Sequence, residues 1–324
     1  MKAERIVSWD SLSGLMIVYM MFIHIMQRSG LAELPVNAVL LRILFFFMPW
    51  FFYKGGHFWK ERSFSQELQV VTRRFLVPYL VFSLAGWGVD ILYLCLTGQA
   101  DIHSLFLTPV HTLIVSGAVP GNLPLWFLPV FAVSRLLFCV LERNRIPPMV
   151  VALVSFAFAW VCNRLLPIPF YIGTTFAGLS FFAFGAACRN FDDRKTVILV
   201  AFAIYLGIMI FFPSVVDVRS NHTLSGWYPV FFVASLSGII TLKGLTSWLL
   251  DGRIRKGPFR FIGLRSLNYY VLHWILLTIC LILSCLFGPM VSWVMALVMG
   301  IVCLTVPAFV HFTPILFPAG NKQR

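Results

Sequence analysis

The sequence predicts an all-α polytopic membrane protein, with about ten transmembrane helices in one bundle and both termini in the cytoplasm. Three observations lead to this fold class. Hydrophobic residues make up 60% of the 324 positions and charged residues only 11%, whereas a soluble domain carries about 25% charged residues. The mean hydropathy is +0.88. The apolar residues are also gathered in long runs, with most basic residues in short segments between them.

The apolar runs approach the length of about 20 residues that a helix needs to cross a bilayer. The predicted spans are residues 11–28, 37–59, 74–97, 123–142, 146–166, 174–190, 195–213, 227–247, 266–287 and 290–312. Residues 98–122 do not form a clean span, and a partial or re-entrant segment could lie there. Because no polar domain or linker interrupts the chain, residues 1–324 are expected to form a single integral membrane domain.

The distribution of lysine and arginine tests this count. With the N-terminus inside, twenty of the 25 basic residues fall on cytoplasmic segments, whereas Arg28, Arg164 and Arg219 fall outside and Arg42 and Arg135 lie within spans. Such an asymmetry orients a membrane protein. The net charge of +13 is therefore interpreted as facing membrane lipids rather than nucleic acid. The expected location is a bacterial cytoplasmic (inner) membrane, crossed several times.

Ionisable side chains inside a span are expensive and indicate candidate functional sites. His24 lies deep in the first span, and Asp10 and Ser13 precede it by fourteen and eleven residues, so the three share roughly one helix face. Asp90 lies at a similar depth in the third span and could orient the imidazole and stabilise its charged form. The alternatives are a structural hydrogen-bonded histidine and an aspartate at the outer interface. His273 falls in the cytoplasmic half of the ninth span.

A second group of basic residues lies on the cytoplasmic side, between the second and third spans. Arg73 and Arg74 are adjacent, and Lys54 and Lys60 are close in sequence. Guanidinium groups bind phosphates well, although positive-inside orientation alone would also explain them. The seven cysteines have no zinc-site spacing and are interpreted as buried apolar residues, so no metal is expected.

Five stretches resemble the integral membrane acyltransferase type 3 family, particularly its sugar O-acetylase branch. The first is "DSLSGLMIVYMMFIH", from Asp10 to His24, which is similar to the family's aspartate-to-histidine first span. The others are "FFFMPWFFYKGG" (45–56), "RRFLVPY" (73–79), "LPLWFLPV" (123–130) and "FIGLRSLNYYVLH" (261–273). Each is weak alone, but their order along the predicted spans is fairly specific.

The resemblance implies an O-acyltransferase that moves an acyl group, usually acetyl, from acetyl-CoA in the cytoplasm to a hydroxyl of a cell-surface glycan or lipid-linked sugar. His24 is then the expected general base, with Asp10 and Asp90 as further catalytic candidates. Arg73, Arg74 and Lys54 are expected to bind the donor. His273 and Ser266 are expected to line the pore between the helices in which the donor binds.

One departure from the family pattern concerns Ser13, where many members carry arginine or lysine. Another cation, from Arg73, Arg74 or Lys54, could replace it, this branch could work differently, or the protein could be an inactive relative in a glycan pathway. A transporter of a lipid-linked sugar or small solute is the other functional class, although no inverted repeat is evident. The sequence leaves open the acceptor, the acyl chain and the oligomeric state.

Overall fold

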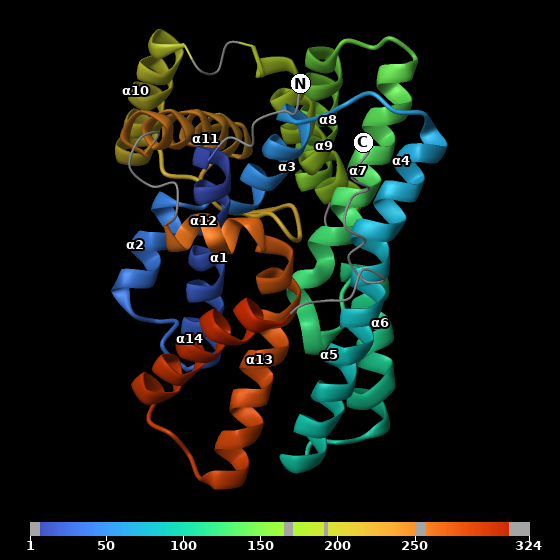
Figure 1. Ribbon diagram of the computed structural model, residues 1–324, viewed down its shortest axis with the longest axis vertical. Coiled ribbons are helices and arrows are strands. Elements are labelled where there is room, and N and C mark those ends of the chain that lie inside the picture. Colours follow the sequence, from blue (N-terminus) through green and yellow to red (C-terminus); the bar gives the residue numbers. More distant parts are fainter. Residues whose placement is uncertain (1–6, 165–170, 191–193, 251–256, 311–324) are drawn as a thin grey trace.

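The computed structural model describes residues 7–164, 171–190, 194–250 and 257–310 (Figure 1). Both chain termini lie outside these ranges. The elements, in chain order, are α1 (Val7–Arg28), α2 (Pro35–Ile43), α3 (Phe47–His57), α4 (Phe64–Val71), η1 (Thr72–Leu76), α5 (Val77–Leu96), η2 (His103–Leu107), α6 (Thr108–Ser116), η3 (Pro120–Trp126), α7 (Phe127–Arg143), α8 (Pro148–Arg164), α9 (Ile172–Cys188), α10 (Lys195–Phe211), β1 (Val215–Asp217), β2 (His222–Ser225), α11 (Tyr228–Leu250), α12 (Pro258–Leu264), α13 (Ser266–Phe287) and α14 (Ser292–Phe309).

The protein is mostly helical and is a multi-pass membrane protein. Within the described ranges, seven helical stretches are long and apolar enough to cross a bilayer: Val7–Arg28, Pro35–His57, Phe64–Leu96, His103–Arg143, Tyr228–Trp248, Ser266–Phe287 and Ser292–Phe309. Three apolar helices of 17 residues each, α8, α9 and α10, are shorter. At 1.5 Å per residue they reach about 25 Å, a little less than the hydrocarbon thickness.

Within the described residues the predicted spans coincide with helices, but several boundaries differ; positions 165–166 and 311–312 of two predicted spans lie outside those residues. The second is divided into α2 and α3 around Leu44. The third begins earlier, because Ser63 and Gln66 form a reciprocal capping box that starts α4, and a π-helical turn then joins α4 to α5. Residues 98–122 hold η2, α6 and the start of η3. The apolar pattern did not predict the turns of α4, because Gln66 and Glu67 are polar.

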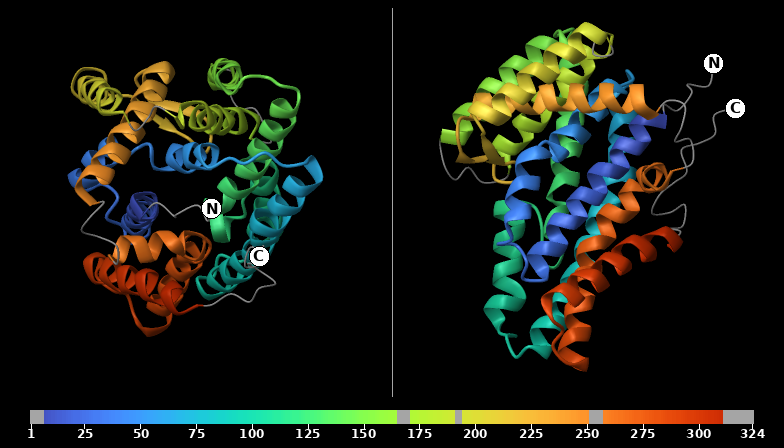
Figure 2. Two further views of the ribbon diagram at one scale, coloured as in Figure 1. Left: turned by 45° about the horizontal axis from the view of Figure 1, so that its top comes forward. Right: turned by 90° about the vertical axis from the view of Figure 1, so that its left-hand side faces the viewer.

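The helices fall into two groups that run in different directions. In the side view of Figure 2, α8 to α11 lie across one end of the group that contains α1, α5 and α13. The two groups meet where α3 and α7 pack against α9. At α3, Gly56 allows the two backbones to touch, since a Cβ there would overlap the carbonyl oxygen of Phe182.

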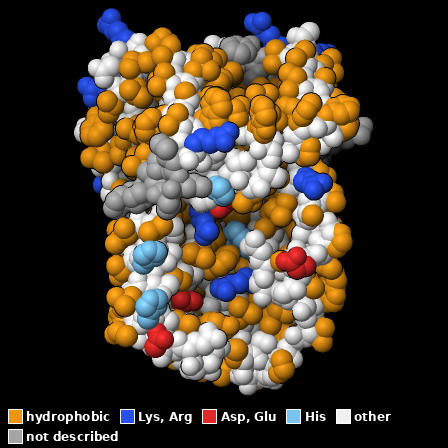
Figure 3. Space-filling model, turned by 180° about the vertical axis from the view of Figure 1, so that it is seen from behind, with side chains coloured by type: hydrophobic (Ala, Val, Ile, Leu, Met, Phe, Trp, Pro, Cys, Tyr) orange, Lys and Arg blue, Asp and Glu red, His pale blue; other side chains and the backbone are white. Residues whose placement is uncertain are grey.

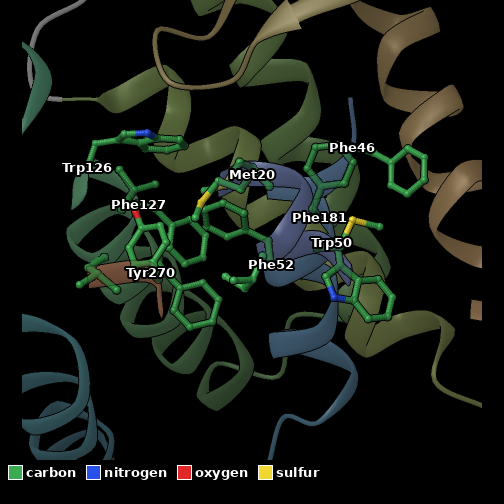
Figure 4. Packing of buried hydrophobic residues seen from close by; sticks show 14 of the residues in the cluster. Met20, Phe46, Trp50, Phe52, Trp126, Phe127, Phe181 and Tyr270 are labelled. Atoms are coloured by element: carbon green, nitrogen blue, oxygen red, sulfur yellow. The ribbon is translucent and has the colours of Figure 1, made fainter. Parts of the chain in front are cut away.

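Aromatic side chains fill the interior between the groups. Phe52 lies edge to face with Phe127, at a centroid separation of 4.9 Å, and Figure 4 shows these rings beside Met20 and Tyr270. On the other side, Phe181 and Phe232 stack at 4.3 Å. Such pairs add to the stabilisation that comes from burying apolar surface. Met20, one turn before His24 on α1, lies beside the first pair of rings.

Candidate functional site

Two histidines far apart in sequence form a hydrogen-bonded pair. Nδ1 of His24, near the end of α1, lies 2.9 Å from Nε2 of His273, in the second turn of α13. The rings are nearly parallel, with centroids 5.1 Å apart and 9° between their planes. His273 is fully buried and His24 is half-buried. The sequence places His273 nearer the cytoplasm than His24, so this pairing corrects the expected depth.

The short helix α12 explains the difference in depth. It packs against the first turns of α1, where a Cβ on Gly14 would overlap the carbonyl oxygen of Phe259, and a Cβ on Gly263 would overlap that of Asp10. Only glycine permits so close an approach. Because α12 occupies this level, α13 starts further along α1. Gly14 lies ten residues before His24, and Gly263 lies ten residues before His273. The two segments therefore meet twice, once at the glycines and once at the histidines.

The hydrogen bonds around the pair define which nitrogens carry protons. Nδ1 of His273 lies 2.7 Å from the carbonyl oxygen of Tyr270 and 3.3 Å from that of Tyr269. A carbonyl only accepts, so Nδ1 of His273 carries the hydrogen, and its Nε2 in a neutral ring is an acceptor. Nδ1 of His24 must then donate to it. Nε2 of His24 is left with a lone pair, as a general base requires.

His24 lines a cavity of about 460 Å³, called here the histidine cavity. Its wall is mostly apolar and aromatic, with a few polar groups, as is typical of small-molecule sites. Nε2 of His24 has no hydrogen-bond partner among the described residues and is not enclosed. The lining residues are Met20, Ile23, His24, Gln27, Leu41, Phe45, Phe47, Met48, Leu123, Pro124, Trp126, Val215, Val216, Asp217, Val218, Arg219, Leu224, Tyr270 and Trp274.

Asp90 does not contact His24 in the way the sequence suggests. No hydrogen bond between described residues joins them, and Asp90 instead interacts electrostatically with Arg28. Arg28 in turn donates from Nη2 to Thr278 Oγ1 at 2.9 Å and lies over the Trp274 ring at 4.6 Å. Asp90 therefore belongs to the surroundings of Arg28, at the same end of α1 as the histidine pair but outside the cavity wall.

At the other end of α1, Lys54 supplies a cation beside Ser13. Its Nζ lies 2.7 Å from Ser13 Oγ and 3.9 Å from Asp10 Oδ1. Lys243 of α11 lies over the Trp9 ring at 5.1 Å, although it is only 2% exposed. Of the three cations that the sequence offers as substitutes near Ser13, Lys54 is the one found there. Along α1, Asp10 and Ser13 precede His24 by fourteen and eleven residues, so the Lys54 contact lies far from His24.

The remaining predicted site residues lie elsewhere. Arg73 and Arg74 are exposed on the π-helical turn η1, and half-buried Ser266 begins α13. None of them lines the histidine cavity. Seen from behind, the surface is largely hydrophobic, and a hollow near its middle gathers basic, acidic and histidine side chains (Figure 3). Of the predicted site residues, the structure brings together His24 and His273, whereas Arg73 and Arg74 lie apart from them.

Sequence reasoning missed Arg219 and the tryptophans of the cavity wall. Arg219 follows β1 in the hairpin between α10 and α11, and Trp126 ends η3. Arg219 stands out in the sequence only as a rare basic residue on a predicted outer segment. Within the described part of the chain, no group of three or more His, Cys, Asp or Glu side chains could hold a metal ion.

Comparison with known proteins identifies no relative of this chain. The chain matches no protein-family model, no curated protein sequence and no solved structure.

Proposed function

We propose that the protein is a membrane-embedded O-acyltransferase that moves an acyl group, in the first instance acetyl, from acyl-CoA to a hydroxyl of a cell-surface glycan or lipid-linked sugar. The observation that carries this proposal is the histidine pair at the wall of the histidine cavity, with Nε2 of His24 unprotonated and accessible. The resemblance of five sequence stretches to membrane acyltransferases points to the same activity.

The reaction needs a base for the acceptor and a route for the donor. Nε2 of His24 takes the hydroxyl proton while the oxygen attacks the thioester carbonyl, the carbon–sulfur bond breaks, and CoA leaves as a thiolate that then accepts a proton. His273 holds the imidazole in the required tautomer through its acceptor nitrogen. The apolar wall keeps the dielectric low, so these hydrogen bonds act strongly.

The proposed topology has ten spans, with both termini in the cytoplasm of a bacterium and the domain in its inner membrane. In this arrangement the donor enters at the Ser13 end of α1, where Lys54 and Lys243 offer positive charge and Arg73 and Arg74 lie on a nearby cytoplasmic segment. Ser13 and His24 are eleven residues apart, or about 16 Å along a helix, a length that the extended arm of CoA can span. The acceptor enters from the hairpin side.

Replacing the base tests the activity. We expect His24→Ala to abolish transfer of label from radioactive acetyl-CoA to the glycan fraction of membranes, while the protein accumulates normally. His111→Ala is a matched control, because His111 is exposed on α6. Undiminished transfer by His24→Ala would refute the mechanism. Movement of a sugar across the membrane of vesicles without acetyl-CoA would favour a transporter.

A further inference from the structure

The hairpin between α10 and α11 carries Arg219 on a rigid support. The Thr174 hydroxyl of α9 donates to the carbonyl oxygen of Arg219 at 2.9 Å, and the Arg219 backbone nitrogen donates to Asp217 Oδ1 at 3.1 Å. Both contacts use the backbone of Arg219, so its side chain is not needed to hold the turn.

Further anchors fix the second half of the hairpin. Buried Asn221 donates from Nδ2 to the carbonyl oxygen of Ala159 at 2.8 Å and accepts from the Tyr228 hydroxyl at 2.9 Å. Asn163 donates to the backbone oxygen of Asn221 at 2.6 Å. A turn held by α8, α9 and α11 presents its side chains in a defined position before any ligand arrives.

The Arg219 guanidinium is the cation that this support presents to the histidine cavity. It is half-buried, lines the cavity together with His24, and lies within electrostatic reach of that ring. Its side chain makes no hydrogen bond or ion pair with another described residue. By contrast, Arg28 is bonded to Thr278 and Arg135 to Glu67. A guanidinium with free donors in a mostly apolar cavity is suited to an oxyanion.

Asp217 also lines the cavity, and each of its carboxylate oxygens accepts a hydrogen bond within the turn. Oδ1 accepts from the backbone nitrogen of Arg219, and Oδ2 accepts from the Ser220 hydroxyl at 2.8 Å. Besides Asp217, the polar lining includes one base, His24, one cation, Arg219, and the neutral amide of Gln27, on an aromatic wall that includes Trp126 and Trp274.

We propose that Arg219 binds an oxyanion of the acceptor, either a sugar carboxylate or the phosphate of a lipid carrier, and so orients the acceptor hydroxyl toward Nε2 of His24. This inference rests on the proposed acyltransferase function, which it deepens by defining the acceptor as anionic. Arg219 acts here as a specificity-determining residue rather than as the base.

Ligand binding to purified protein tests the site without the reaction. Thermal unfolding in lipid nanodiscs is measured with sodium glucuronate, with inorganic pyrophosphate and with neutral methyl glucoside, at matched ionic strength. We expect at least one anion, but not the neutral sugar, to raise the unfolding temperature of the wild type. Arg219→Gln should lose this shift, Arg219→Lys should keep part of it, and Arg164→Gln, which alters an exposed arginine at the end of α8, should keep all of it.

Kinetics with membrane extract as the acceptor source test the role in transfer. Arg219→Gln should raise the half-saturating amount of extract by about 10- to 100-fold, the loss expected for a hydrogen bond to a charged group, with a smaller change in the maximal rate. The half-saturating concentration of acetyl-CoA should stay within about twofold, because the donor binds elsewhere.

The outcomes separate this inference from the proposed function. A shift with glucuronate alone identifies a sugar carboxylate, and a shift with pyrophosphate alone identifies a carrier phosphate. The wild type could show an Arg219-dependent rise in unfolding temperature with an anion but no acetyl transfer. That result would support the anion site and refute the proposed acyltransferase activity. Transfer that is normal in Arg219→Gln, or the absence of any anion shift in the wild type, would overturn the inference.

Discussion

Two charged regions inside this membrane domain differ in whether their hydrogen-bonding groups are satisfied. Around Glu67, which is fully buried, both carboxylate oxygens are paired: Arg135 lies 2.6 Å from Oε1 and Arg62 lies 2.9 Å from Oε2. In the histidine cavity, Arg219 and Nε2 of His24 have no such partners among the described residues. The first region is complete without a ligand, whereas the second has binding capacity left over.

The surroundings of the two regions strengthen the contrast. The Arg135 guanidinium lies 5.2 to 6.0 Å from the centroids of four aromatic rings, those of Trp59, Phe75, Phe131 and Phe182. These rings surround the guanidinium, and its ion pair with Glu67 joins α7 to α4. The aromatic residues near His24 instead line a cavity. A buried charge alone therefore does not indicate a ligand site, and the half-buried Arg219, with unused donors beside a cavity, is the better candidate.

The largest effect is expected from breaking the satisfied region. Glu67→Gln leaves the arginines without their counter-charge, and we expect a loss of stability of about 3–5 kcal/mol, as for other broken buried ion pairs. Thermal unfolding in detergent measures it, with Glu61→Gln, at an exposed position, as the matched control. An unfolding temperature equal to that of the control would show that this network is not structural.

A smaller effect, confined to activity, is expected in the cavity. His273→Leu removes the acceptor for Nδ1 of His24, so the maximal rate of acetyl transfer should fall by about 100-fold while the half-saturating acceptor amount changes little. His273→Gln offers an amide oxygen in place of Nε2 and should recover part of the rate. Equal rates for the two variants would mean that His273 does not position His24.

The smallest effect is expected at the cluster around Ser13, where Lys54 contacts both Ser13 and Asp10. Lys54→Ser removes the cation beside Ser13, and the half-saturating concentration of acetyl-CoA should rise by about 10-fold, the effect of losing one charge-assisted contact. Adding Ser13→Lys to this variant returns a cation to the same place and should restore much of the loss. A double variant no better than the single one would remove Lys54 from the donor site.

Composition and hydropathy predicted the fold class well, because a bilayer requires long apolar helices. The π-helical turn before Pro78 and the separate helix α12 were not predictable, since both depend on packing against neighbours. His24 and His273 were each found because ionisable groups are rare in spans, but their pairing required the offset that α12 imposes. Arg219 could not be found, because its position depends on how Asn163, Thr174 and Tyr228 hold a short hairpin.

The separation of the paired histidines along the chain has a consequence for biosynthesis. His24 and His273 are 249 positions apart, so α1 enters the membrane long before its partner has been translated. During that interval the polar ring must be sheltered by other helices, by lipid headgroups or by the insertion machinery. A chain that stops before α13 would contain most of the helices and still lack the acceptor that positions the His24 ring.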